Sequence, residues 1–241
     1  MSTETSEIIP AGLSDTGYRE PGVVRVSSRT AAILLIFSLF FTALMAGTYQ
    51  LTAPLLEASA QAEKLRLIGE VLPREAYDND LLADNVVLPG VKALGLDYDT
   101  KIYRARKNGE PVALVLEAAA NDGYSGHIGL ILAITKDGRL LSLRVTGHRE
   151  TPGLGDYIDP KKDKNKAKTW ITQFNDRSFN DTPQAKWRVK KDGGVIDQRA
   201  GATISARAVT NASGRALGWA IERADALYAL PTGAHWKETA P

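Results

Sequence analysis

Cysteine is absent from the 241 residues of this chain. Disulfide bonds, thiol nucleophiles and cysteine-ligated iron–sulfur clusters are therefore excluded. Histidine is scarce as well, and no two of His127, His148 and His235 have the spacing of metal ligands. We therefore expect no metal site, and any redox chemistry in this chain requires an organic cofactor.

The chain also lacks a large surplus of charge of one sign. It carries 30 basic and 28 acidic residues, which leaves a formal charge of +2. So small a surplus, without aromatic–basic motifs, argues against nucleic-acid binding. The glycine-rich fingerprints of NADH and ATP sites and the nucleophile elbow of serine hydrolases are missing too. We therefore expect that this chain binds neither NADH nor ATP itself and is not a serine hydrolase.

Charged residues are absent from residues 31–49, where almost every side chain is apolar. This length is close to the roughly 20 residues that cross a bilayer, so a membrane-spanning helix is predicted over residues 30–50. A cleaved signal peptide is the main alternative. The apolar core of a signal peptide is usually shorter, and here a long polar segment precedes the run.

Basic residues flank the predicted span unequally. Arg19, Arg25 and Arg29 lie close before it, whereas the first basic residues after it are Lys64 and Arg66. Positive residues near a span are retained on the cytoplasmic side. The sequence therefore predicts a single-pass membrane protein with a cytoplasmic N-terminus and a main domain outside the cytoplasm. In a Gram-negative bacterium this corresponds to the inner membrane and a periplasmic main domain. The lipid bilayer is one expected partner.

The sequence divides into four predicted parts. They are a polar cytoplasmic tail (1–29), the transmembrane helix (30–50), a helical and irregular connector packed on the domain (51–100) and the main domain (101–241). Within the connector, apolar spacing predicts a helix over residues 55–72. Scattered apolar residues with Pro89 and Gly90 favour irregular structure over residues 79–100.

Short apolar runs separated by turn residues fill the first half of the main domain. Strands are predicted over residues 101–106, 111–119, 128–135 and 140–146. The separators Asn108-Gly109, Asn121-Asp122-Gly123 and Asp137-Gly138 are typical of hairpin turns. A further strand is predicted over residues 187–191, and a final helix over residues 205–230. The expected fold class is α+β, an antiparallel sheet with flanking helices.

A turn of small residues, Gly201-Ala202-Thr203, precedes the final helix. Gly201 permits backbone angles closed to other residues, and Ala202 leaves room for a bulky group to reach Thr203 Oγ. A phosphate held at Thr203 would face the first N–H groups and the positive dipole end of a helix that begins near Ser205. On its own, the pattern is weak evidence, because a Gly-Ala-Thr turn before a helix is most often an ordinary helix N-cap.

A second glycine-rich segment follows the strand predicted over residues 140–146. It reads Gly147-His148-Arg149-Glu150-Thr151-Pro152-Gly153-Leu154-Gly155-Asp156. Its glycines and proline predict a fixed loop with accessible backbone donors and acceptors, which can clamp a flat heterocycle.

Together these two segments resemble the G-type flavin-binding subunits of the Rnf electron-transport complexes, and less closely the C-type subunits of the sodium-pumping NADH:quinone reductase. The resemblance covers nearly the whole chain after residue 30. In that family the threonine of a Ser/Thr-Gly-Ala-Thr signature carries FMN through a phosphoester bond, which the resemblance places on Thr203. Ala200 stands where the family has Ser or Thr. The resemblance also implies a separate flavin transferase, which uses FAD and magnesium and recognises Asp197.

The same resemblance implies an FMN-binding domain with a shell of residues around the flavin ring. The candidate cofactor-binding residues are Thr203 itself, Gly201, Ala202, Ser205, Glu150, Thr151, Gly153, Leu154, Gly155, Tyr124 and Lys190. Thr151 Oγ would bond the polar edge of the ring, and Leu154 would pack on its face. Tyr124 lies in a Gly-Tyr-Ser-Gly segment that also fits a plain turn, and Lys190 fits either a phosphate contact or a solvated lysine.

Five lysines within residues 161–168 form the densest run of positive charge. Such a run is usually solvated. Attraction to an acidic partner or to anionic lipid headgroups is its functional interpretation.

The sequence thus predicts a membrane-anchored electron carrier of an ion-translocating Rnf-type complex. FMN bound covalently to Thr203 would relay electrons between neighbouring subunits, so the activity belongs to the whole complex. A membrane-tethered module that binds flavin or another ligand noncovalently, as a sensor or assembly factor, is the alternative that Ala200 leaves open. A purely structural component of the complex is a third interpretation.

Overall fold

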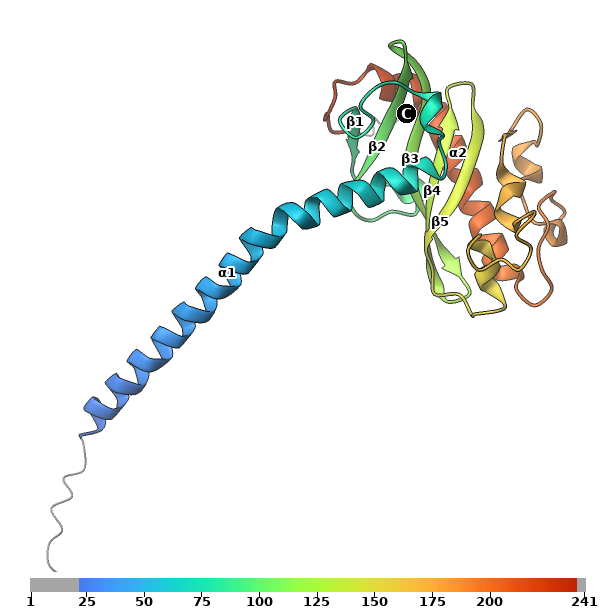
Figure 1. Cartoon of the computed structure of the whole chain (residues 1–241). Helices are drawn as coiled ribbons and strands as arrows, with labels where there is room; N and C mark the ends of the chain where they lie inside the picture. The colour runs from blue at the N-terminus through green and yellow to red at the C-terminus, as the bar shows by residue number, and fades with distance from the viewer. Residues whose placement is uncertain (1–21, 238–241) are drawn as a thin grey trace, which may run out of the picture. The chain divides into compact units, whose positions relative to one another are not determined.

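One long helix opens the part of the chain that the computed structural model describes, residues 22–237. Helix α1 (Val23–Gly69) contains Pro54 and is continuous through the predicted span (Figure 1). The chain separates into two compact units, Met1–Ala58 and Ser59–Pro241, so α1 contributes to both. The predicted tail is described only from residue 22 onward, and there it is largely helical; Arg19 lies outside the described residues.

The first unit exposes the apolar side chains of α1. Ile33, Phe37, Phe40, Leu44 and Met45 are all exposed. By length and composition, the helix qualifies as a membrane span between Arg25 and Gly69. A continuous exposed apolar surface of this kind is typical of a segment that contacts lipid or protein rather than water.

The second unit begins within the same helix. The prediction of helical structure over residues 55–72 is confirmed as far as Gly69, where this segment is the last part of α1, which passes through Pro54 without ending. A proline removes one helical hydrogen bond but does not by itself end a long helix. The helix stops at Gly69, and Ile68, Val71 and Leu72 are buried there.

An antiparallel sheet of six strands forms the centre of the second unit, with the strands in the order of the sequence. The strands are β1 (Asn85–Leu88), β2 (Thr100–Lys107), β3 (Glu110–Gly123), β4 (Gly126–Thr135), β5 (Arg139–Gly147) and β6 (Arg177–Ser178). Four of them, β2 to β5, match the predicted apolar runs. Their alternation fits a sheet that is covered on both faces, since neighbouring side chains point to opposite sides.

The turns between these strands follow the predicted chemistry with one exception. Asn108 and Gly109 both have positive φ, 54° and 81°, as a two-residue hairpin turn requires. Gly138, with φ of 80°, closes the turn between β4 and β5. Asn121 and its neighbours are not a turn, because β3 continues to Gly123. The chain reverses at residues 124–125 instead.

Two expectations about strands are wrong. β1 lies within the segment predicted to be irregular, where it pairs with β2 and receives the C-terminal tail: Val87 N–H donates to Ala234 O at 2.9 Å, and Trp236 N–H donates to Val87 O at 2.8 Å. The strand predicted over residues 187–191 is absent. That segment forms 3₁₀ turns with an isolated bridge from Val189 to Ile196, because Gly193, with φ of 80°, reverses the chain after too few residues for a ladder.

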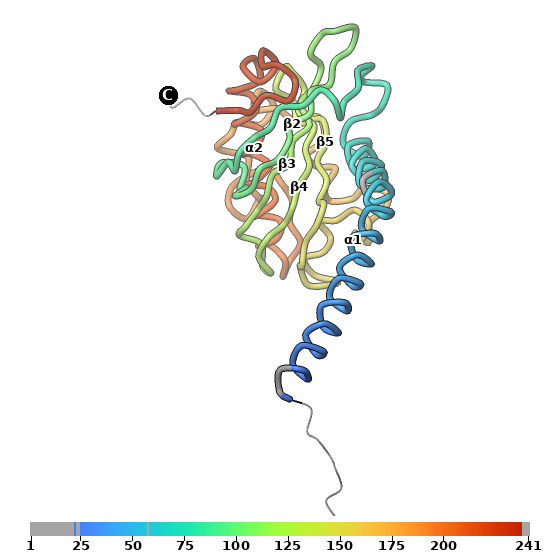
Figure 2. The backbone as a smooth tube through the Cα atoms, turned by 90° about the vertical axis from the view of Figure 1, so that its left-hand side faces the viewer, coloured from blue at the N-terminus to red at the C-terminus, as the bar shows by residue number. Residues whose placement is uncertain are grey.

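Helix α2 (Thr203–Ala229) covers one face of the sheet, and Figure 2 shows the strands between α2 and the last turns of α1. Along β3, Leu114 and Leu116 are buried in the cluster beneath α2, whereas Ala113 and Val115 belong to the cluster with Ile68. The sheet therefore has a core on each side. The predicted α+β class is confirmed.

Two arginines of β2 hold the C-terminal end of α2. Arg104 is only 2 % exposed, and its guanidinium donates to Leu227 O at 3.0 Å and to Asp84 Oδ1 at 2.7 Å. Arg106 donates to Tyr228 O at 3.2 Å and to Asp84 Oδ2 at 2.9 Å. These bonds satisfy carbonyls that the end of a helix leaves unpaired, and they place positive charge at the negative end of the dipole.

Candidate functional site

A hollow of about 240 Å³ lies where three segments of the second unit meet. They are the β3–β4 turn, the glycine-rich loop after β5 and the start of α2. The lining residues are Tyr124, Glu150, Thr151, Leu154, Gly155, Gly201, Ala202, Ile204 and Ser205. Tyr124, Leu154 and Ile204 are 68 %, 53 % and 43 % exposed, so three large apolar side chains face solvent around one opening. Exposed apolar groups gathered in this way are typical of a binding site.

Glu150 ties the three segments together from inside. Its side chain is 3 % exposed, and Oε1 accepts the backbone N–H of Ser125 at 2.9 Å. Oε2 accepts the hydroxyl of Ser205 in the first turn of α2. No cation forms a salt bridge with this carboxylate in the described part of the chain, so the hollow contains a buried negative group held by neutral donors.

Glycines on two sides make room for this carboxylate. A Cβ on Gly155 would lie 2.8 Å from Glu150 Oε2 and 2.5 Å from Ser205 Oγ. A Cβ on Gly123 would lie 3.0 Å from Glu150 Oε1 and closer still to the backbone oxygen of Gly126. Contacts this short are not tolerated, so both positions require glycine for reasons of space.

The loop after β5 is ordered by its own backbone. The N–H groups of Leu154 and Gly155 both donate to Thr151 O at 3.1 Å, and Gly153 N–H donates to Asp156 Oδ1 at 2.9 Å. Gly153 has φ of 77°, which glycine adopts without strain. Glu150 N–H is 3.1 Å from His148 Nδ1, which is therefore an acceptor. These hydrogen bonds stabilise the bend of the loop, and Leu154, which is exposed, lines the hollow.

Helix α2 begins at Thr203 with an end that no side chain caps. The residue before it, Ala202, makes no side-chain cap hydrogen bond, and the first turn has no acidic residue. Gly201 has φ of 79°, and a Cβ there would meet open space. Thr203 is half-buried and makes no side-chain hydrogen bond within residues 22–237. The unpaired N–H groups and the helix dipole favour an anion at this end.

A second layer supports this helix start. Tyr157 OH accepts the backbone N–H of Arg199 at 3.2 Å and donates to Ala202 O at 3.3 Å. The Arg199 guanidinium lies 4.5 Å from the centre of the Tyr157 ring and pairs with Asp163. Burial raises the pKa of Tyr157 above its ordinary value, so the hydroxyl keeps its proton and both hydrogen bonds.

Two of the candidate residues lie apart from the hollow. Lys190 Nζ pairs with Asp197 Oδ1 at 2.6 Å, so the lysine meets a carboxylate of its own chain. Asp197 lines a different hollow of about 270 Å³ together with Lys168, Trp170 and Arg199.

Eight of the candidate residues line the first hollow: Tyr124, Glu150, Thr151, Leu154, Gly155, Gly201, Ala202 and Ser205. Thr203 lies between two lining residues, whereas Gly153 sits at the exposed bend of the loop.

The sequence interpretation did not include Ile204 or the backbone of Ser125. Ile204 is an apolar residue exposed in the first turn of a helix, and this unusual placement was the available signal. Ser125 acts through its main chain, so its residue type carried no signal. No group of three or more His, Asp or Glu side chains within residues 22–237 could hold a metal ion.

Comparison with known families and proteins matches nearly the whole described chain. Residues 123–218 match the FMN-binding domain, and residues 25–71 match the RnfG N-terminal region. The G-type subunit of the ion-translocating oxidoreductase complex from Pseudomonas aeruginosa PAO1 is 42% identical over 189 residues, which are 78% of this chain and 86% of that protein.

Two further relatives have the same description. The G-type subunit from Shewanella baltica OS223 is 38% identical over 199 residues, 83% of this chain and 92% of that protein. The one from Vibrio atlanticus LGP32 is 37% identical over 203 residues, 84% of this chain and 94% of that protein. The similarity therefore covers the long helix and the domain together.

Proposed function

Because this chain belongs to the family of G-type subunits of ion-translocating oxidoreductase complexes, we propose that it is the membrane-anchored electron carrier of such a complex and holds FMN covalently on Thr203. The observation that carries the proposal is the uncapped start of α2, which presents Thr203 beside an apolar hollow. The match to the FMN-binding domain supports the cofactor. Neighbouring subunits of the complex are the electron donor and acceptor.

The residues at the site fit both parts of FMN. The hollow of about 240 Å³ is lined by Tyr124, Leu154 and Ile204, which suits a flat ring rather than a charged group. It is smaller than the roughly 300 Å³ or more of a pocket for a whole drug-sized ligand, so it suits a part of the cofactor. The bare N–H groups of α2 suit the phosphate, because no acidic side chain of the first turn repels it.

FMN supplies a ring that accepts and releases electrons one at a time. Leu154, which lines the hollow, would pack against that ring and limit its contact with water. The loop backbone from Thr151 to Gly155 offers hydrogen-bonding groups to its polar edge, and buried Glu150 places a negative charge nearby. Nearby charge and hydrogen bonds set the potential of a bound flavin.

Attachment requires a phosphoester bond between Thr203 Oγ and the FMN phosphate. A flavin transferase with FAD and magnesium would form this bond and break the phosphoanhydride of FAD, so that AMP leaves and the hydroxyl proton is lost. Nothing is oxidised or reduced in this step. Asp197 lies on the surface beside the start of α2 and is our candidate for recognition by the transferase. Lys190 would act by orienting Asp197 through their salt bridge.

The domain boundaries and the location follow the same proposal. The tail (1–29) lies in the cytoplasm, residues 30–50 cross the inner membrane, the connector (51–100) packs on the domain, and the FMN-binding domain (101–241) is periplasmic. A covalent tether suits that compartment, because a carrier outside the cytoplasm has no pool of free FMN from which to replace a lost cofactor.

Replacing the threonine tests the attachment. With the transferase co-produced, Thr203→Val is expected to remove the whole FMN adduct, because the isosteric side chain lacks the oxygen. Thr203→Ser keeps a hydroxyl and is expected to retain the adduct. Intact-protein mass, which rises by one FMN less one water on attachment, measures both. An adduct on Thr203→Val would refute the site, and an unmodified wild type with bound flavin would favour the noncovalent sensor.

The absence of cysteine makes the orientation testable with single substitutions. Lys136→Cys is expected to react with a membrane-impermeant maleimide in intact spheroplasts, since Lys136 is exposed in the second unit. Ser27→Cys, before the span, is expected to react only after lysis. The reverse pattern would place the domain in the cytoplasm.

A further inference from the structure

Five exposed lysines lie in the loop between the 3₁₀ turns Gly155–Ile158 and Trp170–Phe174. The ammonium group of one of them, Lys166, donates to Pro160 O at 3.1 Å and to Lys161 O at 2.8 Å. We call residues 161–168 the lysine loop; its lysines are Lys161, Lys162, Lys164, Lys166 and Lys168. Lys161 Nζ lies 3.9 Å from a carboxylate oxygen of Glu70, a long contact. Within the described residues, the other four lysines make no salt bridge.

Acidic residues near the lysine loop are engaged by backbone groups. Asp156 accepts the N–H of Gly153 at 2.9 Å, and Asp159 accepts the N–H of Lys161 at 2.8 Å. These two carboxylates lower the local surplus of charge but do not pair with a lysine side chain. The loop therefore presents positive charge to solvent.

The lysine loop is nevertheless rigidly mounted. Asp163, in its middle, is fully buried. Its carboxylate accepts the N–H of Trp170 at 2.6 Å and that of Asn165 at 2.9 Å, and it pairs with Arg199. A mobile loop would lose backbone conformational entropy when a partner ordered it. Because this loop is already ordered, a partner does not meet that cost.

The same carboxylate connects the lysine loop to the candidate flavin site. Arg199, which pairs with Asp163, donates its N–H to Tyr157 OH, and Tyr157 in turn bonds the carbonyl of Ala202 beside Thr203. Asp163 of the lysine loop and Ala202, the residue before Thr203, thus belong to one hydrogen-bonded framework.

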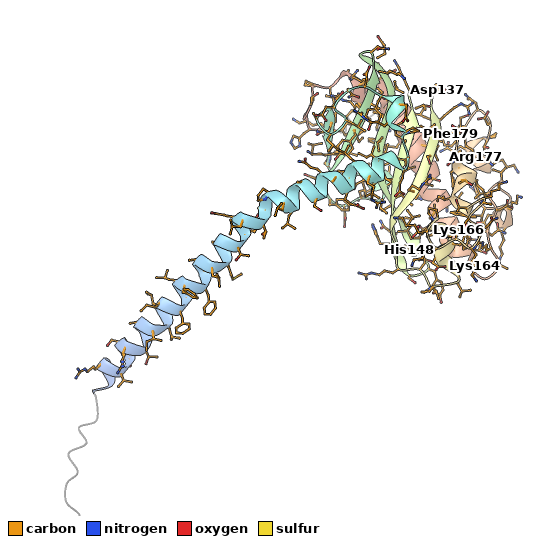
Figure 3. The ribbon with its side chains drawn as sticks, in the orientation of Figure 1. Asp137, His148, Lys164, Lys166, Arg177 and Phe179 are labelled. Atoms are coloured by element: carbon orange, nitrogen blue, oxygen red, sulfur yellow. The ribbon has the colours of Figure 1, made fainter. Side chains whose placement is uncertain are left out.

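Figure 3 shows at which end of the domain the lysine loop lies. Lys164 and Lys166 lie at the same end of the domain as His148, which begins the loop that lines the hollow. Lys168 also lines the neighbouring hollow that contains Asp197.

We propose that the lysine loop is a docking surface for an acidic patch on the neighbouring protein that exchanges electrons with this subunit. The proposal rests on the function proposed above, since an electron partner must approach the edge of the domain that holds the flavin. Complementary charge orients and accelerates such encounters, and its effect weakens as salt rises. The lysine loop, which buried Asp163 holds next to the segment that leads to the candidate flavin site, meets this requirement.

Zero-length cross-linking in the intact complex tests the surface directly. A carbodiimide joins a lysine amine to a carboxylate only where the two are in contact. We expect an amide bond between the lysine loop and an Asp or Glu of another subunit, identified by peptide mass spectrometry. The amide bond should be lost in the triple variant Lys162→Gln/Lys164→Gln/Lys168→Gln. This variant should also dissociate from the complex at a lower salt concentration than the wild type does.

A matched variant controls for the change in total charge. Lys92→Gln/Lys101→Gln/Lys136→Gln removes three exposed lysines that form no salt bridge within residues 22–237. This control variant should dissociate from the complex at the same salt concentration as the wild type. At low salt, electron transfer through the complex should slow about tenfold in the lysine-loop variant and not in the control. Equal effects of the two variants would overturn the proposal.

A lipid surface is the competing occupant, and nanodiscs separate it from a protein. If the lysine-loop variant differed from the wild type only in nanodiscs with phosphatidylglycerol, and no protein cross-link formed, the docking proposal would be wrong. The FMN adduct is weighed in the same samples. Its absence from the wild type would refute the function proposed above, while the cross-link would still decide whether the surface docks a protein.

Discussion

The two ends of α2 are treated in opposite ways. At the C-terminal end, Arg104 and Arg106 bond the last carbonyls and share Asp84. At the N-terminal end, no side chain caps the helix and no acidic residue occupies the first turn. One end is closed by buried charge, whereas the other is left open next to a hollow. The difference indicates that the helix is anchored at one end so that its other end can bind an anion in a fixed position.

Replacing Arg104, which bonds the C-terminal end of α2, is expected to have the largest effect on stability. Arg104→Met leaves carbonyls of α2 unpaired and Asp84 with only Arg106, so the free energy of unfolding should fall by about 3 kcal/mol. Arg106→Met, whose side chain is 24 % exposed in the wild type, should cost about 1 kcal/mol. Urea denaturation measures both. Equal losses would contradict the distinction between a buried and a half-buried anchor.

The segment that precedes the N-terminal end of α2 is held by Asp163, which pairs with Arg199. Burial alone would raise the pKa of this carboxyl, but hydrogen bonds from Trp170, Arg199 and Asn165 outweigh it and lower the pKa below its usual value. Its stabilising contribution is therefore complete above the unfolded pKa of about 3.9 and is lost as pH falls through the lower pKa of the folded state.

Asp163→Asn tests this acid window. At pH 7 the variant should lose about 1–3 kcal/mol of unfolding free energy, because an N–H that bonds the carboxylate loses its acceptor. Below pH 4 its stability should approach that of the wild type. Asp122→Asn, at an exposed position, is the control for removal of one charge. Thermal unfolding followed between pH 7 and 2 gives the comparison, and a constant difference across that range would contradict it.

A charge added at the open end should produce a small stabilisation and a functional loss. Ile204 is in the first turn of α2. Ile204→Glu should be more stable than Ile204→Gln by about 0.5 kcal/mol, because a negative charge suits the dipole. The same charge should repel the phosphate and slow FMN attachment. Denaturation of the flavin-free variants and a time course of the mass adduct measure the two effects. Attachment at equal rates would indicate that the phosphate binds elsewhere.

The main features of the fold could be predicted because their signals are local. Turn residues such as Asn108-Gly109 and alternating apolar residues define β2 to β5 without knowledge of distant contacts. β1 could not be found this way, since one of its neighbours is the C-terminal tail near His235. The strand predicted over residues 187–191 is absent for the converse reason. Its apolar pattern is local, but the segment has no strand to pair with and forms only a single bridge, between Val189 and Ile196.

The candidate site was predictable to a similar degree. Loop glycines and the turn before Thr203 identify segments that must adopt special backbone shapes, and the structure brings those segments together around Glu150. The contributions of Ile204 and of the Ser125 main chain depend on how the segments pack. They could not be read from residue type alone. Whether FMN is attached to Thr203 remains a prediction for the mass measurement.

The pairing of β1 with residues 233–236 has a consequence for how the domain is made. Val87 exchanges backbone hydrogen bonds with Ala234 and Trp236, which are synthesised after every strand of the sheet and after α2. Until they arrive, β1 is an uncovered sheet edge that can pair with another chain. A chain that stopped before residue 233 would therefore contain all six strands and α2 but would leave this edge of the sheet unpaired, and proteases and chaperones can recognise such an edge.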